Sequence, residues 1–186
     1  MGGTVIGLRD MHYALLTKDD STGVTYSEPV KIPGAIQANI NPNSSLETLF
    51  ADDGPSETAA SLGQIELEAI AKDFPLDVQA ILLGHAALVA GVLKRKSGDT
   101  PPFVAFGFKS LKSNGKYRYV WLVKGKFQQP ERQNETKGDT VNFQTPTMAG
   151  SFLKRDNDDI WIMEADEDDA AFVGAATWFT AATIGV

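Results

Sequence analysis

The chain has 186 residues, of which 42% are hydrophobic and 22% are charged, and its formal net charge is −7. This length suits one domain, and this apolar content supports a packed core and excludes a disordered chain. The absence of cysteine excludes disulfide frameworks and thiolate metal sites. The sequence has no run of about 18 apolar residues and no N-terminal signal pattern, so we expect no membrane segment and synthesis in the cytosol.

The charge is distributed in three blocks along the chain. Residues 1–93 carry 4 basic and 12 acidic side chains, residues 94–132 carry 10 and 2, and residues 133–186 carry 3 and 10. A solvated surface is the ordinary explanation of such blocks. The alternative is that the basic and acidic blocks meet on neighbouring subunits of an assembly.

The N-terminal part predicts strands separated by polar turns. The first strand is expected at residues 11–17. Apolar and polar side chains alternate at residues 35–41 and again at residues 64–72, which predicts half-buried strands with one solvated face. Residues 46–51 continue the extended pattern. Residues 52–63 are small and polar and are interpreted as a long connecting loop.

One helix is predicted, from Pro75 to Leu83. Proline is favoured at the first helical position, and Gly84 stands where a helix exit is expected. At about nine residues this helix is marginal alone, so we expect it to pack on a sheet. The residues expected on its buried face are Phe74, Val78, Ile81 and Leu82. Residues 91–96 are interpreted as a further strand.

The strongest local signal lies around Asn114-Gly115, between two runs of aromatic and β-branched residues. Such a pattern predicts a β-hairpin, and a two-residue loop would pair Ser113 with Lys116 and Phe108 with Trp121. Side chains alternate along a strand, so this register gathers on one face Val104, Phe106, Phe108, Tyr117, Tyr119, Trp121 and Val123. We expect that face to be core and the opposite face to be mixed and charged.

The C-terminal third predicts an extended segment at residues 143–154, with Pro146 marking an edge or bulge, and a short strand at residues 158–163. An acidic run then leads into an apolar tail whose Trp178 and Phe179 need burial on this subunit or on a neighbour. We therefore divide the chain into a domain at 1–165 and an acidic linker with an apolar extension at 166–186.

The predicted fold class is mainly β (α+β), a two-sheet β-sandwich with one flanking short α-helix. The sequence contains no phosphate loop, nucleophile elbow, zinc-protease motif or Rossmann fingerprint. Both histidines, His12 and His85, have apolar neighbours along the chain and are interpreted as structural. Glu66 and Glu68 lie one strand repeat apart, which is more typical of a solvated face than of a glycosidase pair. We expect a protein that is not an enzyme, without catalytic, cofactor or metal sites.

Four segments considered together carry a resemblance: residues 13–19, 47–54, 74–85 and 107–121. In their order and spacing, the chain resembles the major tail protein, the tail-tube subunit, of long-tailed, siphophage-type bacteriophages over most of residues 11–165. The resemblance implies a β-sandwich with a flanking helix, whose inner sheet joins a multi-subunit β-barrel. It also implies hexameric rings that stack into a tube, through which the genome passes.

The resemblance further implies the partners and the location. The partners are other copies of the chain, the tape-measure protein, and the tail terminator and tip proteins. Double-stranded DNA passes through the tube without specific binding, and no membrane is involved. The protein is expected in the virion tail, after assembly in the cytoplasm of the host bacterium.

Three sets of residues are candidates for these roles. The lumen is expected to be lined by hairpins within residues 34–71 and about 124–155, with the solvated face of the first supplying Gln37, Asn39, Gln64, Glu66 and Glu68. The candidates for a loop bridging successive rings are Asp53, Gly54, Pro55, Ser56, Glu57 and Thr58. The basic candidates for subunit contacts are Lys109, Lys112, Lys116 and Arg118.

The competing interpretation is a monomeric β-sandwich binding module, for example a carbohydrate-binding module. Trp121, Tyr117 and Tyr119 would then form a platform on which sugar rings stack. The hairpin register favours core for these aromatic residues. Size-exclusion chromatography at two concentrations separates the two interpretations, because a module stays at 20.0 kDa and a tube subunit forms rings or filaments.

Overall fold

The structure is a computed structural model that describes residues 2–51, 54–130 and 145–185. Within these ranges the chain forms nine strands and two short helices. The strands are β1 (Val5–Asp20), β2 (Gly23–Tyr26), β3 (Val30–Ile32), β4 (Ala35–Ala51), β5 (Gly54–Ala71), β6 (Val104–Lys112), β7 (Tyr117–Phe127), β8 (Thr147–Leu153) and β9 (Ile162–Asp166). The helices are α1 (Leu76–Leu83) and α2 (Ala181–Ile184).

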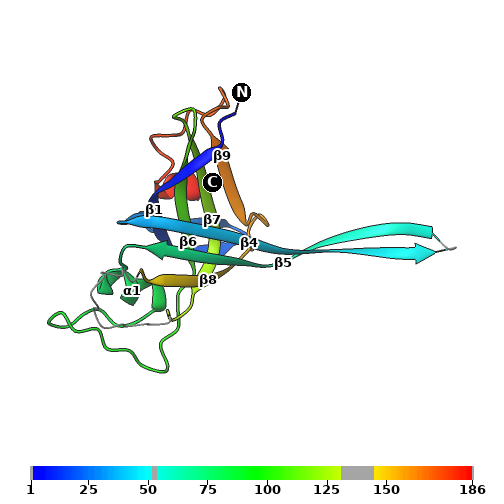
Figure 1. Cartoon of the computed structure of the whole chain (residues 1–186). Coiled ribbons are helices and arrows are strands. Elements are labelled where there is room, and N and C mark those ends of the chain that lie inside the picture. Colours follow the sequence, from blue (N-terminus) through cyan, green and yellow to red (C-terminus); the bar gives the residue numbers. More distant parts are fainter. Residues whose placement is uncertain (1, 52–53, 131–144, 186) are drawn as a thin grey trace, which may run out of the picture.

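The described strands form one antiparallel sheet whose main path runs β2-β1-β6-β7-β8-β5-β4, with β3 paired to β1 and β9 paired to β7 (Figure 1). β7 pairs with β9 along residues 118–122 and with β8 along residues 124–127. The sheet bends there, and side chains of β1 and β6 meet those of β5 in one buried cluster. The predicted mainly β fold with a flanking short helix is confirmed, and its two layers are two halves of one sheet.

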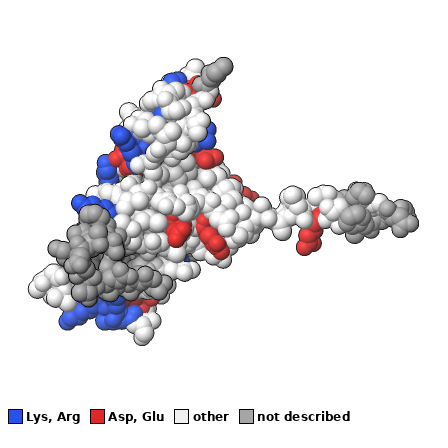
Figure 2. All heavy atoms as spheres, viewed as in Figure 1, with Lys and Arg blue, Asp and Glu red and all other residues white. Residues whose placement is uncertain are grey.

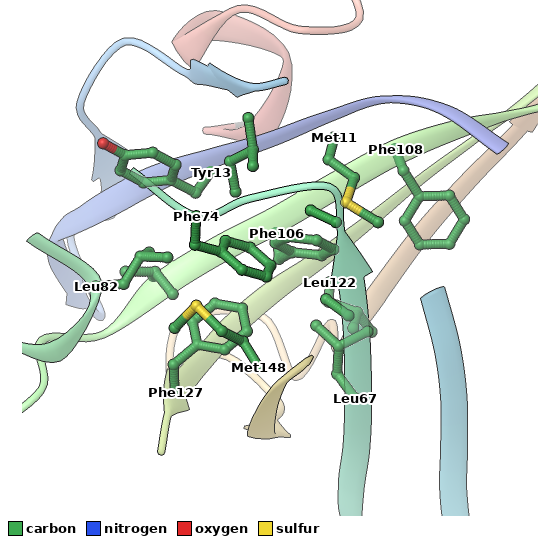
Figure 3. Close-up of a cluster of buried hydrophobic side chains, with 14 of the residues drawn as sticks. Met11, Tyr13, Leu67, Phe74, Leu82, Phe106, Phe108, Leu122, Phe127 and Met148 are labelled. Carbon is green, nitrogen blue, oxygen red and sulfur yellow. The ribbon is translucent and has the colours of Figure 1, made fainter. Parts of the chain in front are cut away.

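The main core lies between these two halves (Figure 3). Phe106 of β6 packs against Phe127 of β7 with ring centroids 5.6 Å apart, and Phe127 packs against Phe152 of β8 at 5.8 Å. Helix α1 closes one end of the core through Val78, Leu82 and Leu83. Burying each such large apolar side chain stabilises the fold by about 1.5–3 kcal/mol.

A second core lies on the opposite face of the β1–β6–β7 half. Ala14, Ala105, Tyr119 and Trp121 are buried there, mainly beneath residues of the C-terminal segment 170–185. The Trp121 indole donates a 3.0 Å hydrogen bond from Nε1 to the carbonyl oxygen of Trp178. Both faces of the β6–β7 hairpin are therefore buried, and the prediction of one core face and one charged face is wrong.

The register of this hairpin also differs from the predicted one by one residue. Gly107, and not Phe108, lies opposite Trp121. The loop is Ser113-Asn114-Gly115, with Lys112 donating a 2.8 Å backbone hydrogen bond to Lys116 and Gly115 at φ 82°. A three-residue loop with glycine in the left-handed region is the next common hairpin turn after the two-residue one. A slip of one residue moves every side chain of one strand to the other face, so Phe106 and Trp121 belong to different cores.

Helix α1 confirms the predicted helix and its C-terminal end, but it begins at Leu76, one residue later than predicted. It follows Pro75 and ends at Gly84, whose φ of 70° is left-handed and whose N–H donates to the helix carbonyls. The predicted buried positions Phe74, Val78 and Leu82 are confirmed, whereas Ile81 is 40% exposed. The strand predicted at residues 91–96 is wrong, because this stretch belongs to a loop with a single isolated bridge.

Most other predicted strands exist with different ends. The strands expected at residues 11–17, 35–41 and 64–72 are confirmed as parts of the longer β1, β4 and β5. The strand expected at residues 158–163 begins later, as β9. The extended segment 143–154 contains β8, and its first two residues lie outside the described ranges.

A β-bulge in β1 is held by one carboxylate. The register of β1 on β6 shifts between Arg9 and His12, and Asp10 within this bulge has φ 52°. The Asp10 carboxylate forms ion pairs with Lys31 of β3 and, at 2.7 Å, with Lys109 of β6. Burial by itself raises the pKa of Asp10, but the hydrogen bonds and charges of the two lysines outweigh it and lower the pKa to about 2.

Asp10→Asn is therefore expected to lower the free energy of unfolding by about 1–2 kcal/mol at pH 7. A carboxylate with a lowered pKa stabilises the fold above its unfolded pKa, and this contribution disappears as the pH falls from about 4 to about 2. Urea unfolding at several pH values should show the two proteins converging in acid. Asp159→Asn is the control, because Asp159 also has a positive φ of 60° but is 74% exposed. A constant difference down to pH 2 would contradict this role of the Asp10 charge.

Candidate assembly interface

The sheet ends in a long edge that no described strand covers. β4 occupies the end of the strand path and pairs only with β5 among the described strands. An uncovered edge presents unpaired N–H and C=O groups to any strand that can add to it. Natural monomers usually keep such edges short or protect them, whereas the β4 edge strand is 17 residues long.

Beyond the body of the molecule, β4 and β5 continue as a projecting hairpin (Figure 1). We call residues 41–64 the arm. The described side chains of the arm are exposed, and Leu46 and Leu62 are apolar residues with 74% and 45% of their surface accessible. None of the arm side chains that the structure describes belongs to either core.

The residues predicted as an inter-ring loop belong to this arm and not to a loop, which corrects that interpretation. Gly54 pairs with Ala51, Pro55 with Phe50, Glu57 with Leu49 and Thr58 with Thr48, and a register shift leaves Ser56 without a direct partner. Asp53 lies outside the described residues. The small residues of this segment do not predict a strand by themselves. They form one because β4 supplies their hydrogen-bond partners.

The residues predicted to line the lumen lie together on the outer face of the β4–β5–β8 half. All are exposed, and they are Gln37, Asn39, Gln64, Glu66 and Glu68. In the ladder Asn39 lies opposite Glu68 and donates a 3.3 Å hydrogen bond to its carboxylate. β8 extends the same face with Ala149 and Ser151. The core side chains of β5, Ile65, Leu67 and Ala69, alternate with these polar ones.

The basic residues predicted for subunit contacts have partners within their own chain. Lys112 is 2% exposed, and its Nζ lies 2.7 Å from the Asp166 carboxylate and also contacts Asp168. Lys116 pairs with Asp168 at 3.4 Å, and Arg118 pairs with Asp166 at 2.9 Å. Hydrogen bonds from Lys112 hold the pKa of Asp166 well below its usual range.

Lys112 is therefore too buried to be a surface contact, and part of the basic block meets the acidic block here within one subunit. Lys109, which pairs with Asp10 at 2.7 Å, and the partly exposed Lys116 and Arg118 stay predictions as subunit contacts. The sequence showed the two charge blocks but not that β7 pairs with β9 and brings them side by side.

The aromatic platform required by a carbohydrate-binding module is covered. Trp121 is fully buried and Tyr119 is 4% exposed. Trp178 and Phe179 of the C-terminal segment lie against these rings, with centroids 5.6–6.2 Å from them. The Tyr119 hydroxyl donates to Glu167 at 2.7 Å, and burial together with this carboxylate raises the pKa of Tyr119.

The two histidines make contacts inside the fold. His12 stacks on Phe179 with ring centroids 4.1 Å apart, and burial lowers its pKa. His85 Nδ1 lies 2.6 Å from the Asp99 carboxylate. In the part of the chain that the structure describes, no group of His, Asp and Glu side chains is arranged to hold a metal ion. Neither α1 nor α2 has the length and apolar character needed to cross a membrane.

No protein-family model matches this chain, and no curated protein matches it. Four features bear on the function of the chain: the uncovered β4 edge, the arm, the polar outer face of β4, β5 and β8, and the resemblance of the four sequence segments.

Proposed function

We propose that this chain is a structural subunit of a bacteriophage tail tube, stacking as hexameric rings that form the conduit for DNA. The observation that supports the proposal best is the long β4 edge continuing into the exposed arm. A monomer with such an edge is prone to aggregation, whereas a ring of copies joined edge to edge has no free edge.

In such a ring the inner sheet closes into a barrel, and the polar face of β4, β5 and β8 lines the channel. Glu66 and Glu68 give this face negative charge, and the stretch from residue 35 to residue 71 contains no lysine or arginine. DNA carries a phosphate charge about every 1.7 Å of helix axis, and basic walls would retain it through counterion release. An acidic and polar wall lets DNA slide without specific binding.

The proposal includes the partners and the location that the resemblance implies. The subunit would contact other copies of itself, the tape-measure protein, and the terminator and tip proteins of the tail. It would act in the virion tail as a non-enzymatic component.

The direct test is electron microscopy of the purified full-length protein, together with sedimentation velocity at two concentrations. The expected result is rings or tubes with a central channel, favoured at the higher concentration. A single 20.0 kDa species at all concentrations, with no rings or tubes in the micrographs, would overturn the proposal.

Reversing two charges tests the assignment of the channel wall. Glu66→Lys/Glu68→Lys is expected to leave the fold intact, because both side chains are exposed, and to make tubes retain duplex DNA at low salt. Cosedimentation of tubes with DNA at about 50 mM and about 500 mM salt measures this effect, which should vanish at the higher salt. Glu164→Lys, an exposed change on β9, is the control. Equal retention by the control and the double variant would place Glu66 and Glu68 outside the channel.

A further inference from the structure

The turn of the β6–β7 hairpin contains the only asparagine–glycine pair of the sequence, Asn114-Gly115. Such a pair is prone to spontaneous deamidation, because glycine has no side chain to hinder attack of its backbone nitrogen on the asparagine side chain. Residues 113–116 are exposed, so water reaches the pair. The turn therefore has both the sequence and the exposure that this reaction requires.

The reaction needs only the two residues and water. The Gly115 nitrogen gives up its hydrogen and bonds to Cγ of Asn114, while the bond from Cγ to Nδ2 breaks. The Nδ2 group leaves as ammonia with the hydrogen that Gly115 released, and a five-membered succinimide ring remains. One water molecule then opens the ring at either carbonyl, which gives aspartate or isoaspartate. No electrons are transferred in either step.

Three hydrogen bonds of the folded chain hold the reacting groups. Nδ2 of Asn114 donates a 2.7 Å hydrogen bond to the Asp168 carboxylate, and Oδ1 accepts one of 3.2 Å from the backbone N–H of Lys116. The Gly115 N–H donates a 3.0 Å hydrogen bond to the Lys112 carbonyl. The amide cannot rotate towards Gly115 without losing both of its bonds, and the bond to the anionic carboxylate is the stronger kind.

The Asp168 carboxylate is itself fixed by other parts of the chain. It accepts a 3.4 Å hydrogen bond from the Gly3 N–H and contacts the Nζ atoms of Lys112 and, at 3.4 Å, of Lys116. The hydrogen bond from Lys112 is the largest cause that lowers the pKa of Asp168, so this side chain is an anion at neutral pH. Figure 2 shows acidic and basic atoms close together at the end of the molecule where Figure 1 marks the N-terminus.

We infer that Asn114 is a deamidation site, and that Asp168 holds the reaction back while the chain is folded. In the product a carboxylate takes the place of the amide and lies opposite Asp168. Two carboxylates form no hydrogen bond with each other, and their charges repel. Deamidation therefore breaks the tie between the hairpin turn and the acidic run that precedes the C-terminal segment. The inference concerns contacts within one chain and does not depend on the proposed function.

Mass spectrometry of peptides that contain residues 112–117 measures the conversion of Asn114. The full-length protein is incubated at mildly alkaline pH, with and without urea. The folded protein should react about tenfold more slowly than the unfolded one, because several hydrogen bonds must break first. Asn114→Gln is the control and should not react, since its ring would have six members. Equal rates with and without urea, or no conversion in urea, would overturn the inference.

Two substitutions of Asp168 test its part in the protection. Asp168→Ala should speed the reaction of the folded protein about fivefold, whereas Asp168→Asn keeps an oxygen acceptor for the Asn114 amide and should stay near the native rate. Lys112 keeps Asp166 as a partner at 2.7 Å in both variants, so we expect both to fold, which circular dichroism checks. Asp169→Ala is the control, because the Asp169 carboxylate accepts from the Ala171 N–H instead.

Equal rates for Asp168→Ala and the native protein would show that Asp168 does not protect the pair. If Asp168→Asn reacts as fast as Asp168→Ala, the lost charge is responsible and not the lost hydrogen bond, which would also contradict the inference. A native rate for Asp168→Asn with a faster Asp168→Ala supports it.

Asn114→Asp imitates one product and tests the effect on the fold. Residues 166–168 already match in number the three nearby cations Lys112, Lys116 and Arg118, so the added carboxylate has no cation left to pair with among these groups. The thermal midpoint should fall by about 2–5 °C. Asn114→Ala removes the donor without adding charge and should cost less, and the difference should shrink at high salt. A native midpoint for Asn114→Asp would show that the tie does not break.

Discussion

Shortening the arm is expected to abolish tubes while leaving the isolated subunit folded. The variant replaces residues 46–60 with Asn-Gly, which joins Ser45 to Ser61, a directly opposed pair in the ladder, through a two-residue turn. The described side chains removed are exposed, and none belongs to either core. The thermal midpoint of the dispersed subunit should therefore stay within about 5 °C of the native value.

The design of the deletion matters because the arm is a hairpin. Replacing only Asp53 to Ser61, as a loop interpretation of this segment suggests, would remove most of the distal half of β5 and leave β4 without its partner. Thr48→Ala/Thr58→Ala keeps the arm length and is the control, since these two residues face each other across the ladder. Tubes of normal length from the shortened protein, at the same concentration and salt, would contradict an assembly role for the arm.

Truncation after Asp169 is expected to unfold the subunit itself. The removed segment contributes Trp178 and Ile184 to the second core, and it includes the carbonyl that accepts the Trp121 hydrogen bond. The buried guanidinium of Arg155 also donates a 2.7 Å hydrogen bond to the Ile184 carbonyl. Several buried side chains at about 2–3 kcal/mol each approach the whole stability of a domain, which is about 5–15 kcal/mol.

A graded variant makes this expectation measurable when the truncated chain does not fold. Trp178→Ala should lower the free energy of unfolding by about 3–5 kcal/mol, while Val173→Ala, at a position 93% exposed, should change it by less than about 0.5 kcal/mol. Chemical denaturation of the dispersed subunit gives both values. A truncated protein that keeps its thermal midpoint but fails to assemble would instead show that the segment docks on a neighbour.

Local signals in the sequence were sufficient for the elements whose cause is local. The alternation of Glu66 and Glu68 with Ile65 and Leu67 predicted a strand with one buried and one exposed face, and both faces are as expected. Pro75 and Gly84 marked the two ends of the helix, because proline is tolerated at a helix start, where its missing N–H has no helical partner, and glycine accepts the left-handed exit. The Asn114-Gly115 pair located the turn of the central hairpin, although its loop has three residues.

The remaining features depended on contacts between residues far apart in the chain. Residues 54–62 have no strand pattern of their own and become a strand because β4 pairs with them. The second face of the β6–β7 hairpin is buried only because the C-terminal segment, about 50 residues further along, covers it. Likewise, Lys112 is an internal residue and not a subunit contact because β9 brings Asp166 to it.

Local sequence patterns were enough to predict the β-rich class, helix α1, the position of the central turn and the polar side of β5. The hairpin register, the arm, the burial of both faces of β6 and β7, and the partners of the basic residues became known only from the folded chain. Periodicity and turn chemistry act between near neighbours, whereas register and burial depend on which distant strand supplies hydrogen bonds and apolar contacts.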